Sequence, residues 1–286
     1  MEKTVQSTKA NPLAKYFRQP AIYMQLPSNG KYWPEDSIEL PVTGEIEVYP
    51  MTTRDEITLR TPDALMNGSG VVDVIQSCCP NIKNAWKTPN IDIDAILIAI
   101  RIASYGEQLD IDTTCPHCSS ENKHNLDLHQ CLSSIGSPNY DKPLLLDDLK
   151  VKLKPQEYFM VNKENSINFE EQKILQALEN VEIDEQVRSQ EILKSMNRLV
   201  EISIEVLSNA TEYFELSDGK RITDYDFIKE FYTKIPGSTF KLIQGRLLEI
   251  TKDGGVPPQN MRCIQCSQEY ISPLTFDYAN FFGKGF

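Results

Sequence analysis

The chain has 286 residues, of which 40% are hydrophobic, and its formal net charge is −12. This length and this hydrophobic content allow a sizeable buried core in one or two domains, and the sequence lacks a run of about eighteen apolar residues that would predict a membrane span. The acidic balance disfavours nucleic-acid binding, which needs clustered Lys and Arg to neutralise phosphates.

Cysteine usage predicts the compartment in which the protein is made. The first ten residues, MEKTVQSTKA, have no apolar region typical of a secretory signal. Four of the seven cysteines occur in two CxxC pairs. This pattern favours a reducing compartment and metal binding over disulfides, so we expect a cytoplasmic protein.

Residues 1–50 are predicted to form an N-terminal arm with short strands and a small hairpin. The segment from Asn11 to Pro50 is rich in proline, which forbids long helices. Five of its six aromatic residues either dock on a partner or cover the protein's own core, and the sequence leaves both readings open. These aromatic residues are Tyr16, Phe17, Tyr23, Tyr32 and Trp33.

Residues 51–105 are predicted to form a helical core. A first helix is expected over 53–66, with Thr53 and Glu56 in the spacing of a capping box. A second helix covers 71–79, and a third, apolar on nearly every face, covers 91–105 and ends at Gly106. Adjacent helical side chains point about 100° apart, so we interpret the neighbours Cys78 and Cys79 as buried apolar residues and not as chelating ligands.

The rest of the chain is predicted to be a helical insert between two halves of a small β module. The strands 109–114 and 123–128 flank the first CxxC pair, and residues 133–143 form a loop. The insert, residues 133–256, begins with a strand at 149–155 and continues mainly as helix. Its expected helices are 170–180, 184–209, 225–234 and 239–252, with Thr223 and Ser238 as candidate caps of the last two.

The two CxxC pairs share one local plan of strand, knuckle, polar turn and strand. The segment TTCPHCSSENKHNL is repeated as MRCIQCSQEYISPL. Together they supply four thiolates, which is a ligand set of the structural zinc-ribbon kind. The predicted zinc ligands are Cys115, Cys118, Cys263 and Cys266. Because 144 residues lie between the pairs, this site requires the two ends of the insert to lie close together.

The residues leave three alternatives to this long-range site. Cys115 and Cys118 could recruit Cys131 with His124 or His129 and form a local site. The two pairs could instead be metal-free or redox-active, although a redox CxxC normally opens a helix. Pairing between knuckles of different chains is the third alternative.

The predicted four-cysteine zinc site is not expected to catalyse a reaction. A closed four-cysteine site has no open coordination position, so it cannot activate water or a substrate. The sequence contains no recognisable catalytic or phosphate-binding motif. We therefore expect a protein that is not an enzyme, with no catalytic residues and no small-molecule substrate.

Five ordered blocks between Asn11 and Leu128 carry a family resemblance. They include the PSNGKYWP turn, the VYPMTTRDE entry, TPDALMNG, VIQSCCPNIKN and ILIAIRIASYG. With these blocks the chain resembles the baseplate hub assembly proteins of T-even-type contractile-tailed bacteriophages. Trp33 departs from the family pattern, in which a smaller aromatic residue is expected. Beyond residue 130 the resemblance is limited to the paired CxxC plan and the helical character.

The resemblance implies a structural or assembly protein of the tail baseplate hub. Its partners would be other baseplate hub and tail proteins, with no nucleic acid and no membrane. It would act in the host cytoplasm during assembly, and the resemblance leaves open both a subunit that stays in the virion baseplate and an assembly factor that leaves. The competing hypothesis is a zinc-ribbon protein that binds nucleic acid or acts in transcription.

For the fold we expect an α+β class with a mainly helical core, short β-hairpins, and a split zinc ribbon over 106–132 and 257–286 that includes the C-terminal tail. That tail contains Phe276, Tyr278, Phe281, Phe282 and Phe286, which either pack on the ribbon or contact a partner.

Overall fold

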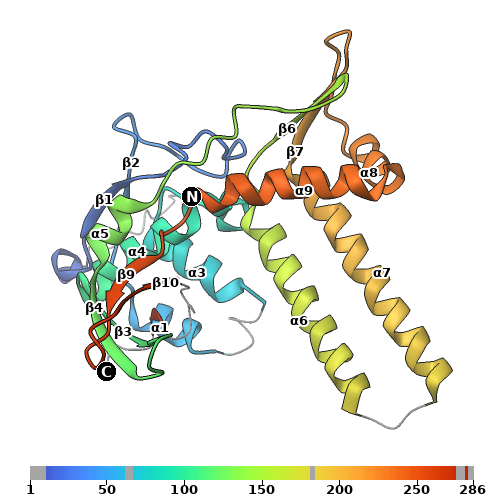
Figure 1. Cartoon of the computed structure of the whole chain (residues 1–286). Coiled ribbons are helices and arrows are strands. Elements are labelled where there is room, and N and C mark those ends of the chain that lie inside the picture. Colours follow the sequence, from blue (N-terminus) through green and yellow to red (C-terminus); the bar gives the residue numbers. More distant parts are fainter. Residues whose placement is uncertain (1–10, 62–66, 181–183, 275–280, 283–286) are drawn as a thin grey trace, which may run out of the picture.

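The structure is a computed structural model that describes residues 11–61, 67–180, 184–274 and 281–282. It combines helices with small antiparallel sheets, as expected for an α+β protein (Figure 1). The described apolar residues form two large clusters. The first cluster draws on segments from both ends of the chain, and the second lies mostly within residues 140–250. None of the described helices has both the length and the hydropathy that a membrane crossing requires.

Helix α4 (Asn90–Tyr105) lies at the centre of the first cluster, as its sequence predicts. Eleven of its residues are buried, because apolar side chains occupy nearly all of its faces. The helix ends at Gly106, whose φ of 88° suits glycine. Helices α1 (Thr53–Leu59) and α3 (Ser69–Cys78) pack beside it. Cys78 and Cys79 are buried in this cluster, which confirms their interpretation as apolar core residues.

The N-terminal strands are part of the first cluster. Strand β1 (Ile22–Gln25) pairs antiparallel with β2 (Glu45–Val48), which confirms the expected short hairpin. Met24 and Ile46 face each other across the pair and are both buried. Residues 22–48 therefore contribute core side chains, and their removal would open the cluster. By contrast, the short η1 helix (Ala14–Tyr16) has no buried residue.

A buried carboxylate fixes the turn that follows β1. The Ser28 amide donates to one oxygen of Asp92 at 2.8 Å, and the Ser28 hydroxyl donates to the other at 2.5 Å. The Trp33 indole also donates to Asp92, at 2.8 Å. Burial raises the pKa of Asp92, against the lowering effect of these hydrogen bonds. Trp33 packs on the first cluster and Tyr32 on the second, so these two aromatic residues belong to the core.

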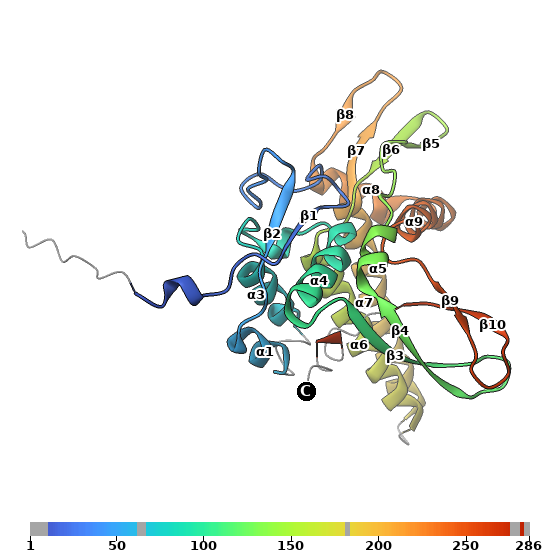
Figure 2. The ribbon, with the colours of Figure 1, turned by 90° about the vertical axis from the view of Figure 1, so that its left-hand side faces the viewer.

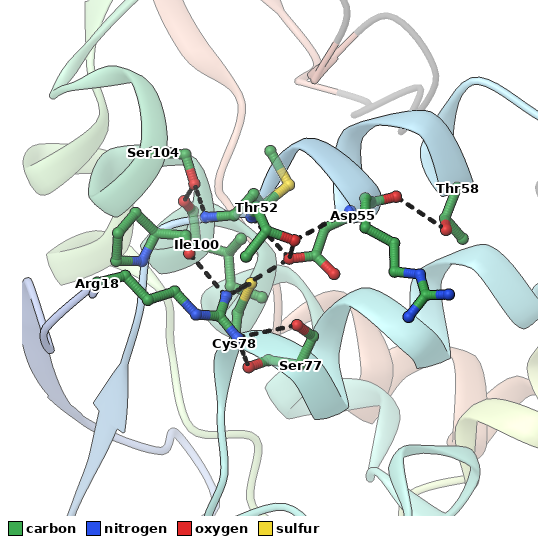
Figure 3. A network of polar contacts seen from close by, with 11 residues as sticks. Arg18, Thr52, Asp55, Thr58, Ser77, Cys78, Ile100 and Ser104 are labelled. Carbon is green, nitrogen blue, oxygen red and sulfur yellow. Dashed lines mark hydrogen bonds and ion pairs between the residues drawn. The ribbon is translucent and has the colours of Figure 1, made fainter. Parts of the chain in front are cut away.

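Arg18 ties the beginning of the described chain to α1 and α3 (Figure 3). Its guanidinium donates to the carbonyl oxygens of Pro50 and Ser77, at 2.8 and 2.7 Å, and lies 3.4 Å from a carboxylate oxygen of Asp55. Asp55 also accepts from the amide of Thr52, the residue that caps α1. The capping box was thus predicted one position late, because Thr52, not Thr53, has the extended backbone of a cap. Helix α1 ends at Leu59, short of the predicted end at Met66, which lies outside the described residues.

The central hairpin follows α4 directly. Strands β3 (Gln108–Thr114) and β4 (Glu121–Asp127) pair over seven residues, and α5 (Leu128–Ser134) packs back on α4. The two strands confirm the predicted strand–knuckle–strand segment. The short η2 helix (Ala85–Lys87) precedes α4. Trp86 of η2 stacks on Tyr158 at 5.8 Å between ring centroids.

The second cluster is built on a four-stranded sheet and the last three helices of this part of the chain, together with Ile91 of α4. The sheet has the order β5 (Leu144–Leu146), β6 (Leu149–Leu153), β7 (Thr211–Glu215) and β8 (Arg221–Ile222). Helices α6 (Tyr158–Asn180) and α7 (Glu185–Ala210) form a long hairpin that projects from the body (Figure 1), and α8 (Tyr225–Lys234) and α9 (Gly237–Lys252) follow.

Several boundaries in this part differ from the sequence-based expectation. Only the strand of β6 was predicted in this sheet, and α6 begins at Tyr158, twelve residues before the predicted start. Asp224, not Thr223, caps α8, because its carboxylate accepts from two amides of the first turn. Helix α9 begins directly after Pro236 without a side-chain cap, so Ser238 does not cap it.

The two ends of the segment between the CxxC pairs come together. A Cβ atom on Gly136 would collide with the carbonyl oxygen of Asp253, and one on Gly254 would lie 2.7 Å from the Pro138 ring. From there the chain enters β9 (Gln259–Arg262) and β10 (Glu269–Ser272), an antiparallel pair that confirms the second predicted hairpin. Of the C-terminal aromatic residues, Phe281 and Phe282 are buried in the first cluster. Phe276, Tyr278 and Phe286 lie outside the described residues.

Candidate metal centre

The first knuckle is the turn between β3 and β4. The Cys115 amide donates to the Ser120 carbonyl at 2.9 Å, and the Ser119 amide donates to the Cys115 carbonyl at 2.9 Å. Ser119 has a φ of 59°, which reverses the chain directly after Cys118. The turn thereby places the sulfurs of Cys115 and Cys118 on the same side.

The second knuckle, between β9 and β10, repeats this backbone geometry. The Cys263 amide donates to the Gln268 carbonyl at 2.9 Å, and the Ser267 amide donates to the Cys263 carbonyl at 3.0 Å. Ser267 has a φ of 61°, which matches the φ of Ser119. The repeat noticed in the sequence, CPHCSS beside CIQCSQ, therefore corresponds to two turns of the same conformation.

The structure brings the four predicted cysteines together in one cluster. The sulfur of Cys115 lies 3.8 Å from that of Cys266, and the sulfur of Cys118 lies 3.6 Å from that of Cys263. All four sulfurs lie within 4.8 Å of one another. A tetrahedral zinc with Zn–S bonds of about 2.3 Å requires sulfurs about 3.8 Å apart, whereas a disulfide requires about 2.05 Å. The spacing fits a shared metal ion.

Polar side chains dock the two hairpins beside the sulfurs, and the ribbons of the two hairpins lie side by side in Figure 2. The Asn122 side chain is buried, accepts from the Ile264 amide at 2.8 Å and donates to the Ser120 carbonyl at 3.0 Å. One amide group thus links the backbones of both knuckles. The Tyr270 hydroxyl lies 2.6 Å from the Thr113 hydroxyl and hydrogen-bonds His124 at 3.1 Å.

The thiols of the cluster have very different proton affinities. The Cys266 amide and then the Ser120 hydroxyl hydrogen-bond the Cys263 sulfur and lower the pKa of Cys263 to about 5. The Ser120 hydroxyl also lowers the pKa of Cys118. For Cys266, the amide of Gln268 lowers the pKa, but burial and the neighbouring sulfurs outweigh it and raise the pKa to about 12. The cluster therefore already favours thiolate at two positions, which is the form that binds a metal.

The residues of the alternative local site are occupied elsewhere. Cys131 is buried in the first cluster, and burial raises its pKa. His124 is hydrogen-bonded to Tyr270, and His129 lies 3.9 Å from a Glu107 carboxylate oxygen. His117 is exposed within the first knuckle. Among the described residues, the only cluster with metal-ligand spacing is the one formed by the four predicted cysteines.

Sequence reasoning identified the sulfurs but not the residues that support them. Ser120, Asn122 and Tyr270 are ordinary polar residues in the sequence. A weak signal was available for Asn122, because it is the one buried polar residue of a strand that directly follows a knuckle. The partner of Asn122 is a backbone amide 142 positions away, and only the folded chain reveals it.

The chemistry available to the four sulfurs is structural. If they hold one metal ion, all its tetrahedral positions are filled by protein and none is open to water or substrate. Such a metal would join the β3–β4 hairpin to the β9–β10 hairpin and thereby close the loop that contains the second cluster.

Comparison with known proteins identifies one family. A family model described as "T4 bacteriophage base plate protein" matches residues 22–283, which include both hairpins, the first cluster and the whole insert. No curated protein and no solved structure matches the chain.

Proposed function

Because the chain belongs to the T4 bacteriophage base plate protein family, we propose that it is a structural or assembly protein of the tail baseplate hub that acts through contacts with other tail proteins. The family match, which extends over nearly the whole chain, supports the baseplate role, and the resemblance of residues 11–128 to hub assembly proteins supports the place in the hub. The four-cysteine cluster adds a rigid joint suited to a scaffold. This role places the protein in the host cytoplasm during assembly and then in the tail of the virion.

The cluster is proposed to bind one structural zinc ion through Cys115, Cys118, Cys263 and Cys266. The support for this is the sulfur spacing, together with amides and a hydroxyl that favour thiolate. A hub protein that contacts several neighbours must keep its surfaces in fixed register. A metal that fastens the two ends of the insert would provide that register without a disulfide, which a reducing cytoplasm disfavours.

The N-terminal segment offers two exposed aromatic side chains for such a contact. Tyr16 is 73% exposed and Phe17 is 56% exposed, and neither belongs to a described apolar cluster. Large aromatic residues are enriched at the energetic centres of protein interfaces. We therefore propose this segment, and not residues 22–48, whose strands contribute to the first cluster, as the part of the arm that docks on a hub protein.

The proposal is tested by measuring the binding of the protein to each purified hub protein separately. The full chain and its Tyr16→Ala/Phe17→Ala variant are assayed against each hub protein by co-purification and by calorimetry. The matched control is Tyr225→Ala/Phe227→Ala, which removes the same two residue types from the exposed face of α8. We expect the N-terminal variant to bind at least about tenfold more weakly, a loss of about 1.4 kcal/mol, and the control to bind as the wild type does.

Two results would contradict the proposal. If the wild-type chain binds none of the hub proteins and its deletion leaves baseplates complete, the hub role is wrong. If the two variants weaken binding equally, the N-terminal segment is not the docking surface, although the hub role itself would stand.

A further inference from the structure

A cationic cleft lies between the N-terminal part of the chain and the four-stranded sheet. Its volume is about 620 Å³. One wall is the turn that follows β1, residues 31–34, and the other is the exposed face of β6, β7 and β8. Five lining side chains are cationic and three are acidic, although the whole chain carries a net charge of −12. The cleft thus concentrates positive charge on an acidic protein. Its cations are Lys31, Lys87, Lys152, Lys154 and Arg221.

The alternation of β6 places two of these lysines in the cleft. Val151 and Leu153 are buried on one face of the strand, so Lys152 lies on the opposite face, which lines the cleft. Lys154 directly follows the strand and lines the cleft as well. Its amide donates to the Ala210 carbonyl at 2.8 Å, which extends the pairing of this segment by one residue. In an extended strand, residues two apart are separated by about 6.7 Å.

Lys152 is buried more deeply than its hydrogen bonds account for. Its side chain is only 12% exposed, yet its ammonium makes a single hydrogen bond to a described residue, to the Asp141 carbonyl at 3.0 Å. The Asp141 carboxylate is farther away, at 3.6 Å, and is also paired with Lys31. An ammonium has three donors, and a charge removed from water needs partners that replace the water. Two donors of Lys152 are therefore available to an acceptor in the cleft.

The acidic side chains of the cleft do not supply that acceptor. Glu157 is paired with Lys87, at 3.6 Å. Among the described residues, no ion pair joins Lys154 to a carboxylate. The Asp141 side chain is 66% exposed, so its ion pairs are weak and another carboxylate can compete with it.

From these observations we propose that the cleft binds an extended acidic segment of a partner protein, with carboxylates on alternate residues. Alternate side chains of an extended peptide lie on one face and repeat at the same spacing as Lys152 and Lys154. One carboxylate can therefore reach each ammonium and form a charge-assisted hydrogen bond. The rings of Tyr32 and Tyr213 line the same cleft and offer apolar contact to the stems of the acidic side chains.

A peptide fits this cleft better than a nucleic acid does. A nucleic acid carries a phosphate at every nucleotide, and the acidic Asp141, Glu157 and Glu212 among the lining side chains would repel a continuous line of negative charge. A peptide can place uncharged residues opposite them. The inference does not rest on the hub role, and its residues differ from Tyr16 and Phe17, so each proposal can fail without the other.

The proposal is tested by measuring the binding of a labelled peptide of four Glu-Thr repeats to the full-length protein by fluorescence anisotropy. A neutral peptide of four Gln-Thr repeats and a thymidine octanucleotide are measured beside it. We expect the acidic peptide to bind, and its affinity to fall at least about tenfold between about 50 and about 500 mM salt, because salt screens the charges. The other two ligands should bind at least about tenfold more weakly than the acidic peptide.

A pair of variants locates the binding in the cleft. Lys152→Gln/Lys154→Gln removes both charges and should weaken binding of the acidic peptide at least about tenfold. Lys241→Gln/Lys252→Gln is the matched control, because both lysines are exposed on α9 and the net charge changes equally. This control should bind within about twofold of the wild type.

The two tryptophans provide a second readout that needs no variant of the cleft. Trp33 lines the cleft and Trp86 lies outside it, and the chain has two tryptophans in all. Added acidic peptide should shift the nuclear magnetic resonance of the Trp33 indole N–H and leave that of Trp86 in place. Trp86→Phe assigns the two signals.

Several results would overturn the proposal. The wild-type protein might leave the acidic peptide unbound, or bind the neutral peptide equally well, and either result removes the charge recognition. A preference for the octanucleotide would replace the acidic segment with nucleic acid as the occupant. If the cleft variant and its control bind alike, or if the Trp33 signal stays in place, the cleft is not the site.

Discussion

The segments at the two ends of the chain are fastened to the same α4-centred cluster by different means. The N-terminal segment is held by apolar side chains and by two polar anchors, the partly buried Arg18 and the buried Asp92. The C-terminal hairpin, β9–β10, contributes Met261 and Tyr270 to the cluster, but its docking is centred on four sulfurs contributed by both hairpins. The N-terminal attachment is fixed once the chain folds. If the proposed zinc ion is bound there, the C-terminal attachment depends on it, and a chelator or a fall in pH should release it.

This difference leads to four predictions, and the largest effect is expected at the sulfurs. Removing zinc with a chelator, or with Cys263→Ser/Cys266→Ser, should loosen the insert relative to the first cluster. Closing the loop from Cys118 to Cys263 removes chain entropy on the order of 4–5 kcal/mol, if the disulfide estimate applies to a metal link. Far-UV circular dichroism should change little, since the helices keep their own apolar faces, while proteolysis near 253–260 and 129–143 should rise sharply.

The two junctions should respond unequally to zinc removal. The start of α6 is held independently by the stacking of Trp86 on Tyr158, whereas residues 253–258 lead directly to the released hairpin. Cleavage near 253–260 should therefore appear first. The control is Cys131→Ser, which alters a buried cysteine that does not belong to the four-cysteine cluster, and this variant should keep the metal. Unchanged cleavage at both junctions after verified zinc loss would show that the metal is dispensable for their order.

The next largest effect is expected at Asp92, the buried anchor of the N-terminal segment. Asp92→Ala leaves the Trp33 indole and the Ser28 groups without their acceptor, which should lower the free energy of unfolding by about 3 kcal/mol. The exposed Asp148→Ala is the control and should change it by less than about 0.5 kcal/mol. Urea denaturation measures both. If the Asp92→Ala and Asp148→Ala variants have equal free energies of unfolding, water replaces the lost Asp92 carboxylate as the hydrogen-bond acceptor.

Arg18 should contribute somewhat less than Asp92, because its side chain is 30% exposed. Arg18→Ala removes charge-assisted hydrogen bonds to Pro50 and Ser77 and should lower the free energy of unfolding by about 2 kcal/mol. Arg54→Ala, on the exposed side of α1, serves as the matched control. Zinc content should be unaffected in both variants. A loss of zinc from the Arg18 variant would show that the two attachments are coupled and not independent.

The smallest effect is expected from the hydroxyl that joins the two hairpins. Tyr270→Phe keeps the buried ring but removes the contacts to Thr113 and His124, which should lower the free energy of unfolding by about 1 kcal/mol. Tyr23→Phe, at a residue that is 58% exposed, is the control. Thermal unfolding of the zinc-loaded proteins measures the difference. An effect as large as that of Asp92→Ala would assign much of the C-terminal attachment to polar contacts and reduce the role of the metal.

The same contrast explains how far the sequence could predict this molecule. Helix α4 and the two CxxC hairpins were predictable, because apolar periodicity and cysteine spacing are local signals. The four-stranded sheet was largely missed, since β5 and β8 have only three and two residues and β7 pairs with β6 across the intervening α6–α7 hairpin. Arg18, Asp92 and Asn122 could not be recognised as anchors, because each acts through a backbone or side-chain group at least 32 positions away.

The central claim is that one metal, held by four sulfurs, joins the two hairpins. X-ray absorption spectroscopy at the zinc edge of the purified full-length protein, combined with its metal content, tests this claim most directly. We expect one zinc ion per chain, with four sulfur ligands at about 2.3 Å. A protein without zinc, or a zinc shell that contains nitrogen or oxygen ligands in place of any of the four sulfurs, would contradict it.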